Sequence, residues 1–351
     1  MRRAIYSTTT DRALALLARA PWVHLASTTP EGAPVLRTVH TVLFDGHLSF
    51  HGADAGEKVS CLGREVVLGA EEALATLPSY VLDPERACPA TTYYESAQVR
   101  GVLEAVHDLD RKAAILQALM ERHQPEGGHA VIRADDPLYA RVLEQLLVVQ
   151  VRLDDVCGKL KVGQNRSPRQ LTRIVEFLWR RGVPGDLETV ELMRATMPEL
   201  TLPDALVAPE GYRFMLRLDE ARLEEVLDLI APTYWSQGFT REQVGVAVRA
   251  SHVVGVVEEV TERLVAIARA ISDGTRHAWI YDVVVAEALR GRGLGESMMR
   301  LLLDHAAVRG ARSVRLGTRD AEGFYARLGF VTVEEAGVGR PWRTIEMVRV
   351  G

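Results

Sequence analysis

One segment, from Trp279 to Leu303, constrains the fold more than any other part of the chain. It begins with a short apolar, β-branched run, Trp279 to Val285, which predicts a buried strand. A glycine-rich turn follows, and beyond it apolar residues recur at helical spacing. In such a strand–turn–helix unit, free backbone N–H groups and the positive end of the helix dipole converge on one point. The segment therefore predicts a pyrophosphate-binding turn.

The spacing of the glycines separates this turn from two common phosphate-binding motifs. Gly291, Gly293 and Gly295 lie two residues apart, whereas a dinucleotide-binding fingerprint has the pattern G-x-G-x-x-G. The lysine of the P-loop pattern is also absent. The predicted anion site therefore belongs to another class.

Length and composition indicate two globular domains. A chain of 351 residues exceeds what one hydrophobic core usually organises. Its 47% hydrophobic and 25% charged residues are ordinary for a globular protein, and a net charge of −5 predicts neither a nucleic-acid nor a membrane partner.

The pattern of cysteines and of apolar runs predicts a cytoplasmic protein without a bound metal. No apolar run is long enough to span a bilayer, and Asp11, Arg12 and Arg19 interrupt the start, which therefore does not resemble a secretion signal. Three scattered cysteines suit a reducing compartment. Neither these nor the dispersed histidines show metal-ligand spacing.

The first part of the chain predicts a small antiparallel barrel with flanking helices, because several short strands precede any long helix. We expect strands over the ranges 22–27, 34–44, 47–51 and 66–69, a short helix over 57–62, and a hairpin turn at Asp45-Gly46. A proline-punctuated linker over about residues 198–210 then separates a first domain, 1–197, from a second, 211–351. The expected fold class is α+β: a split β-barrel followed by a mixed α/β sheet.

Two features of the second domain suggest a site for chemistry. Asp282 is the only carboxylate within the predicted central strand, and we interpret it as a general base; its alternative role is structural, and Glu258 and Glu259 are rival bases. Tyr234 and Trp235 lie in a loop dense in aromatic residues, which predicts an acceptor pocket unless these rings pack into the core.

The turn and a later segment resemble the GNAT acetyltransferases. Arg290, Gly293 and Gly295 match the family's Arg-x-x-Gly-x-Gly signature, and residues 321–330 resemble its A-x-x-F-Y-x-x-x-G-F helix and turn. The resemblance implies an acetyl-CoA-dependent N-acetyltransferase in which Tyr325 protonates the departing thiolate. It further implies that acetyl-CoA is held by Val283, Val285, Arg290, Gly291, Arg292, Gly293, Leu294 and Gly295.

The first domain resembles FMN-binding split barrels related to pyridoxamine 5'-phosphate oxidase, and especially the nitroimidazole-resistance flavoproteins. The resemblance is carried by Leu25-Ala26-Ser27, by residues 31–34 and by the run from Phe50 to Lys58. It implies a homodimer that binds FMN through Arg37, Thr38, Val39, His51, Lys58, Tyr94, Ser96 and Gln98.

Residues 158–166 carry a second cluster of positive charge. Lys159 and Lys161 occupy alternate positions of a predicted strand, so their side chains point the same way, and Arg166 follows. The run resembles one in flavin-binding regulators of the same barrel class. The two lysines are therefore further candidates for FMN contacts, with a solvated surface as the alternative.

The leading hypothesis is a bifunctional protein that transfers acetyl groups to a small amine and binds FMN in its first domain. One alternative is a flavin-dependent reductase of nitro compounds or quinones with an accessory acetyltransferase. Another is a flavin or haem sensor that regulates the transferase, since His24, His40 and His51 keep haem possible.

Overall fold

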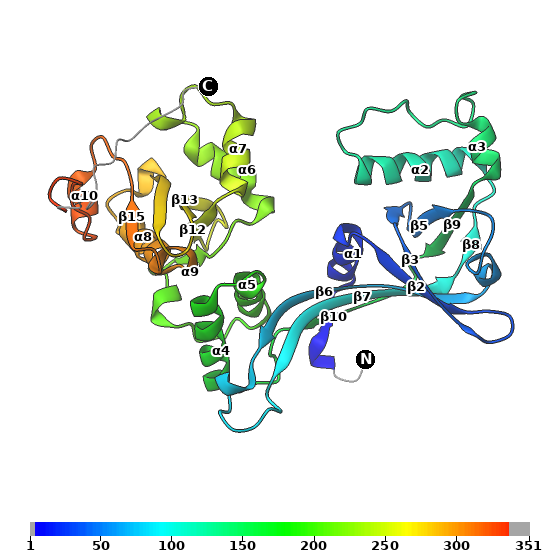
Figure 1. The fold of residues 1–351 in the computed structure, drawn as a ribbon, viewed down its shortest axis with the longest axis horizontal. Helices are drawn as coiled ribbons and strands as arrows, with labels where there is room; N and C mark the ends of the chain where they lie inside the picture. Colours follow the sequence, from blue (N-terminus) through cyan, green and yellow to red (C-terminus); the bar gives the residue numbers. More distant parts are fainter. Residues whose placement is uncertain (1–3, 337–351) are drawn as a thin grey trace. The chain divides into compact units, whose positions relative to one another are not determined.

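A computed structural model describes residues 4–336 and divides the chain into two compact units. The first comprises Met1–Ile174 and Pro184–Leu200, and the second comprises Val175–Val183 and Thr201–Gly351. The end of the second domain expected from the sequence, 337–351, lies outside the described residues. Figure 1 shows helices and sheets in both units, which confirms the α+β class.

The first unit is built on two antiparallel sheets, as a split barrel requires. The six-stranded sheet has the order β1 (Ser7–Thr8), β10 (Asp155–Lys161), β7 (Thr91–Val102), β6 (Glu65–Leu77), β2 (Val23–Thr28) and β3 (Pro34–Val39). The four-stranded sheet has the order β4 (Val42–Phe44), β5 (His47–Gly52), β9 (Leu147–Arg152) and β8 (Glu104–Ala105). Inward residues of both sheets, such as Leu25, Phe50 and Leu68, share one buried core.

Two helices of the first unit begin at side-chain caps. Thr9 accepts the backbone N–H of Arg12 at the start of α1, and Asp108 accepts that of Arg111 at the start of α2. The unit's helices, the last part of α4 excepted, are α1 (Thr10–Arg19), α2 (Leu109–His123), α3 (Ala140–Gln145), α4 (Pro168–Arg181) and α5 (Asp186–Thr196).

Two expectations for the first unit were wrong. The strand predicted over residues 34–44 is two strands, β3 and β4, which belong to different sheets because the chain leaves one sheet at His40-Thr41. The helix predicted over 57–62 is a single 3₁₀ turn, Val59–Cys61, and Lys58 precedes it without capping it. So short a turn provides little helix dipole for an anion.

Within the described residues, the second unit contains one five-stranded sheet. Its order is β11 (Tyr212–Met215), β12 (His252–Glu258), β13 (Leu264–Ser272), β14 (His277–Val285) and β15 (Ser313–Arg315). Only β14 and β15 are parallel. Residues 253–257 of β12 are all buried, so this strand is covered on both faces.

Helices on both sides of this sheet provide that cover. Leu223, Leu227 and Val248 of the first two helices share a core with Val253 and Val257, while α8 contacts β12, β13 and β14. The helices are α6 (Leu223–Ile230), α7 (Arg241–Arg249), α8 (Leu294–Asp304), α9 (Ala306–Arg309) and α10 (Glu322–Ala326). Within residues 4–336 no helix is both long and apolar enough to cross a bilayer.

Candidate functional site

The turn between β14 and α8 has the backbone conformation that its glycines suggest. Gly291 and Gly293 have φ values of 77° and 81°, where a side chain would be strained, and Gly293 occupies the N-cap of α8. A Cβ at Gly295 would lie 3.4 Å from Val285 Cγ2, so the helix start packs closely on the strand. The Arg290 side chain donates to the Val285 carbonyl oxygen over 3.2 Å.

A cavity of about 910 Å³ lies along this turn. The ends of β14 and α8 line it on one side, and the segment from Arg319 to Arg327 lines it on another. Of the residues expected to hold acetyl-CoA, all except Arg292 line it: Val283, Val285, Arg290, Gly291, Gly293, Leu294 and Gly295. Its volume and its helix N-terminus suit an extended molecule that carries a pyrophosphate.

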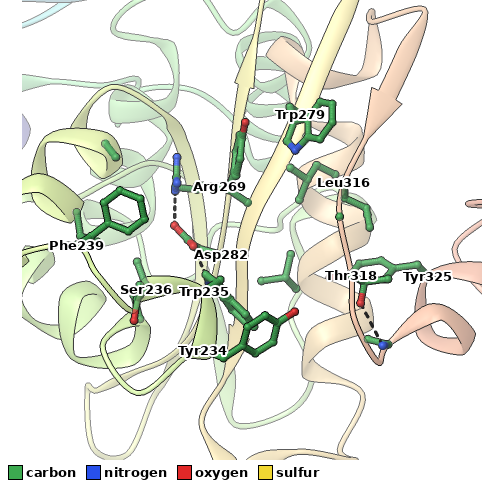
Figure 2. Close-up of a pocket in the computed structure, with 18 of the residues that line it drawn as sticks. Tyr234, Trp235, Ser236, Phe239, Arg269, Trp279, Asp282, Leu316, Thr318 and Tyr325 are labelled. Atoms are coloured by element: carbon green, nitrogen blue, oxygen red, sulfur yellow. Dashed lines mark hydrogen bonds and ion pairs between the residues drawn. The ribbon is translucent and has the colours of Figure 1, made fainter. Parts of the chain in front are cut away.

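A second cavity, of about 690 Å³, lies beside the first. Aromatic side chains form much of its wall: Tyr234, Trp235 and Phe239 come from the segment between α6 and α7, and Trp279 and Tyr281 come from β14 (Figure 2). Each of these residues is at least 38% exposed, so none of them is part of the hydrophobic core. The residues that line both cavities are Tyr234, Trp235, Val283, Asp320, Ala321 and Tyr325.

The strand β14 bulges where the two cavities meet. Ile267 pairs with Val284 and Arg269 with Tyr281, so β14 contains one residue more than β13 over this interval. The extra residue disrupts the ladder, and Asp282 takes a φ of 49° there. A bulge leaves backbone groups of the strand unpaired. Asp282 lines the second cavity and Val283 lines both, so the bulge lies at their junction.

Asp282, the proposed base, has both carboxylate oxygens engaged. Oδ1 accepts the indole N–H of Trp235 over 2.8 Å, and Oδ2 accepts from the Arg269 guanidinium (Figure 2). Arg269 also donates to Ser251 Oγ over 2.9 Å and lies over the ring of Tyr281. The Arg269 and Asp282 side chains are only 10% and 8% exposed, so this is a buried ion pair.

Sequence reasoning missed Arg269 and Asp320. Arg269 is the only charged residue within the apolar strand β13, and that isolation could have suggested Asp282 as its partner. Asp320 is the one carboxylate, among the described residues, that lines both cavities; its side chain is 65% exposed and pairs with the neighbouring Arg319. The rival bases Glu258 and Glu259 line neither cavity.

Tyr325 lies on α10 at the wall that the cavities share. Its burial, with a smaller effect of Tyr234, raises the pKa of its hydroxyl above the usual tyrosine value. A phenol in this environment stays protonated at neutral pH and is able to donate its proton.

The residues expected to bind FMN lie on two faces of the first unit. Strand pairing places Arg37 level with Val99, so Arg37 and Val39 face one side of the sheet while Thr38 faces the other. Val99 lies on β7, three strands from β3, and Tyr94 is five residues from Val99 along β7. The strand spacing and the rise per residue together separate Arg37 from Tyr94 by roughly 20 Å. Ser96 and Gln98, like Tyr94, alternate with the inward residues of β7.

The two ends of this set also differ in charge. Near β5, Arg37 pairs with Glu57 and the Lys58 ammonium packs against Gly52. Burial and the nearby Lys58 and His40 lower the pKa of His51, which favours its neutral form. Arg37 is therefore neutralised, whereas Lys58 has no carboxylate partner within residues 4–336 and is one free charge at this end.

At the other end, Lys159 and Lys161 both point toward Tyr94, as the alternation predicted. Their ammonium groups lie 4.8 and 5.7 Å from the centre of its ring. Within residues 4–336, neither lysine nor Arg166 has a carboxylate partner. The two ends therefore do not converge on one flavin site within a single chain.

Comparison with known proteins assigns each unit to a family. Residues 9–160 match the model of "Pyridoxamine 5'-phosphate oxidase", and residues 220–330 match that of the "Acetyltransferase (GNAT) family". GCN5-related N-acetyltransferase 1, chloroplastic, of Arabidopsis thaliana is 33% identical over 145 residues, which are 40% of this chain and 72% of the relative. Serotonin N-acetyltransferase 2, chloroplastic, of Oryza sativa subsp. japonica is 32% identical over 143 residues, 38% of this chain and 68% of the relative.

The chain therefore belongs to the GNAT acetyltransferases, and its other part is a pyridoxamine 5'-phosphate oxidase-like domain. Among solved structures, the FAD and haem binding protein from Mycobacterium smegmatis is similar to the first part, with 22% identity and a TM-score of 0.38. That match covers 44% of this chain and 72% of the other.

In the described part of the chain, no group of three or more histidine, cysteine, aspartate or glutamate side chains could hold a metal ion.

Proposed function

We propose that the second unit transfers the acetyl group of acetyl-CoA to the primary amine of a small molecule with an aromatic or apolar body. The observation that carries this proposal is the junction of the two cavities at Val283 and Tyr325. One cavity follows a pyrophosphate-type turn, and the other is a separate aromatic chamber. A donor and an acceptor bound in the two would therefore meet beside Tyr325.

The residues of the junction suit each part of the reaction. The amine nitrogen forms a bond to the thioester carbon as the carbon–sulfur bond breaks. Backbone N–H groups freed at the bulge around Val283 would stabilise the developing oxyanion. Tyr325 would give its hydroxyl proton to the departing thiolate. The amine nitrogen loses one proton as it becomes an amide nitrogen, and this proton balances the one that Tyr325 has given up.

Asp320 is the better placed of two carboxylates to receive the amine proton, through water. It lines both cavities and engages only the adjacent Arg319, whereas Asp282 has both oxygens engaged by Arg269 and Trp235. The sequence-based hypothesis gave this role to Asp282, and the kcat and pH profile of Asp282→Asn test it.

The wall of the acceptor cavity supports an aromatic amine over a phosphorylated one. Its six aromatic rings, Tyr325 included, offer planar apolar contact, and its cation, Arg269, is neutralised by Asp282. One relative of this chain is named for serotonin, an aromatic amine, although that name describes the relative alone.

An amine screen tests the proposal. Purified full-length protein is given acetyl-CoA with tryptamine, phenethylamine, spermidine or glucosamine 6-phosphate, and release of the free thiol is followed. We expect the first two amines to give the highest kcat/KM. Failure of every amine, together with no heat on titration with acetyl-CoA, would refute the transferase assignment.

The first unit is proposed to bind a cofactor, with FMN as the first candidate and haem as the second. We further propose that the protein is a homodimer and that it resides in the cytoplasm. The match to the pyridoxamine 5'-phosphate oxidase family supports the ligand class. The absorption spectrum of the purified protein distinguishes a flavin, a haem Soret band and no chromophore, and light scattering measures the oligomeric state.

A further inference from the structure

The side chain of Trp235 stands where the donor and acceptor cavities adjoin. It belongs to a short 3₁₀ turn, Tyr234–Ser236, that has no side-chain cap, and it is 40% exposed. A side chain on so short an element, half open to solvent, would normally sample several rotamers. Because Trp235 lines both cavities, its rotamer sets the shape of the wall between them.

A chain of polar contacts, which leads from the exposed indole to the buried Arg269–Asp282 pair, holds this indole in one orientation. Its Nε1–H donates to Asp282, Asp282 accepts from Arg269, and Arg269 donates to Ser251 at the junction of α7 and β12. The loop side chain is thereby connected to two strands of the central sheet. Figure 2 shows Asp282 between Arg269 and Trp235, on the side of β14 that faces the aromatic loop.

The bulge in β14 and the positive φ of Asp282 determine where its side chain points. A regular strand would alternate its side chains strictly, but the extra residue at the bulge and the φ of 49° redirect Asp282. Positive φ is unfavourable for a residue with a side chain, so the surrounding contacts must hold it there. The Arg269–Asp282 ion pair, shielded from water, provides such a contact.

We propose that Asp282 is a positioning residue: with Arg269, it fixes the indole of Trp235 as the wall that orients an aromatic acceptor amine against the acetyl donor. This inference rests on the proposed function for its substrate, while the contacts themselves do not depend on it. A residue in this role influences how well the amine binds and is oriented, and contributes little to proton transfer.

Four variants of the full-length protein test the role. Trp235→Phe keeps a ring but removes the donor. Asp282→Asn is made alone and combined with Arg269→Gln, which replaces the ion pair with neutral amides and so avoids a buried unpaired charge. Trp279→Phe is the control for the resonance measurement below, since it removes an indole that has no hydrogen-bond partner within residues 4–336.

The expected kinetic result is a change in amine binding. Trp235→Phe and the double variant should each raise the KM of tryptamine about tenfold with kcat within threefold of the wild type, and the pH profile of kcat/KM should keep its shape. The single variant Asp282→Asn should behave likewise. If Asp282→Asn instead lowers kcat more than a hundredfold and removes the acidic limb of that profile, while Trp235→Phe resembles the wild type, Asp282 is a base and the proposal is overturned.

A spectroscopic measurement separates this proposal from the transferase assignment. The ¹H–¹⁵N indole resonance of Trp235, assigned by its loss in Trp235→Phe, should move in the double variant and stay in place in Trp279→Phe. An unmoved resonance overturns the proposal whether or not any amine is acetylated. A moved resonance with no acetyl transfer by the wild type would refute only the proposed function.

Discussion

The residues named from sequence in the second unit surround two adjoining cavities, whereas those named in the first unit lie on opposite faces of a sheet. The acetyl-CoA residues follow one another along a strand end, a turn and a helix start, so local geometry alone brings them together. The FMN candidates come from β3, β5, β7, β10 and the loop at Lys58, and strand pairing places Arg37 of β3 roughly 20 Å from Tyr94 of β7. A site formed by one continuous segment can thus be read from sequence more safely than one assembled across a sheet.

The largest expected effect tests the chemistry of the second unit. Tyr325→Phe should lower kcat at least a hundredfold, because loss of a general acid typically costs a factor of about 10²–10⁴, while the KM of acetyl-CoA changes little. Since the pKa of Tyr325 is raised, wild-type activity should persist above pH ~10, where an ordinary tyrosine is ionised. Unchanged turnover in Tyr325→Phe would remove the residue from the mechanism.

A second prediction concerns stability at acid pH. Burial, together with His252 and Arg309, lowers the pKa of His305 to about 4, whereas an unfolded chain would have a value of about 6.5. The unfolded state therefore binds the extra proton first, and stability falls as the pH drops from about 6.5 toward 4. By linkage, this histidine contributes a loss of roughly 2–3 kcal/mol at pH 4.5.

Urea unfolding of the full chain at pH 7.5 and pH 4.5 measures this loss. His305→Asn should remove most of the pH dependence while its side-chain oxygen still accepts the N–H of Ala307, which His305 caps. His277→Asn, at an exposed histidine of the same unit, is the control and should behave as the wild type. Equal slopes for the wild type and His305→Asn would contradict the prediction.

A third prediction tests whether acetyl-CoA binding depends on the backbone conformation of the glycine turn. Gly293→Val places a β-branched residue at a φ of 81°, a strain of roughly 1–3 kcal/mol. We expect the Kd of acetyl-CoA to rise about tenfold in calorimetry. Gly274→Val, with a φ of 76° in the turn at the other end of β14, carries similar strain away from the cavity and should leave the Kd unchanged.

The smallest expected effect compares the two ends of the first unit. Lys161 lies with Lys159 and Arg166, and its burial and these charges lower its pKa, so an anion there would relieve repulsion. Lys161→Gln should weaken FMN binding about threefold at low salt, and Lys58→Gln less than twofold, as measured by flavin fluorescence. The reverse ranking would place the phosphate beside β5.

Particular elements show why sequence reasoning succeeded and failed. The capped starts of α1 and α2, and the strand–turn–helix from β14 to α8, depend on neighbouring residues and were anticipated. The division of residues 34–44 between two sheets was missed, because both halves are equally suited to extended structure and only their partners distinguish them. The Arg269–Asp282 pair was missed because the two residues are joined only across paired strands.

By itself, the sequence determined that the chain is long enough for two domains and that a glycine turn joins a strand to a helix, since both depend on composition or on short-range backbone sterics. The candidate acid Tyr325 came from the resemblance of residues 321–330 to the GNAT family. Only the tertiary structure decided that a bulge turns Asp282 toward Arg269 and Trp235, that Asp320 stands at the junction of both cavities, and that the barrel's cationic residues form two separate groups. The physical reason is that strand register and loop packing join residues far apart in the chain, and these contacts carry no signature in local sequence.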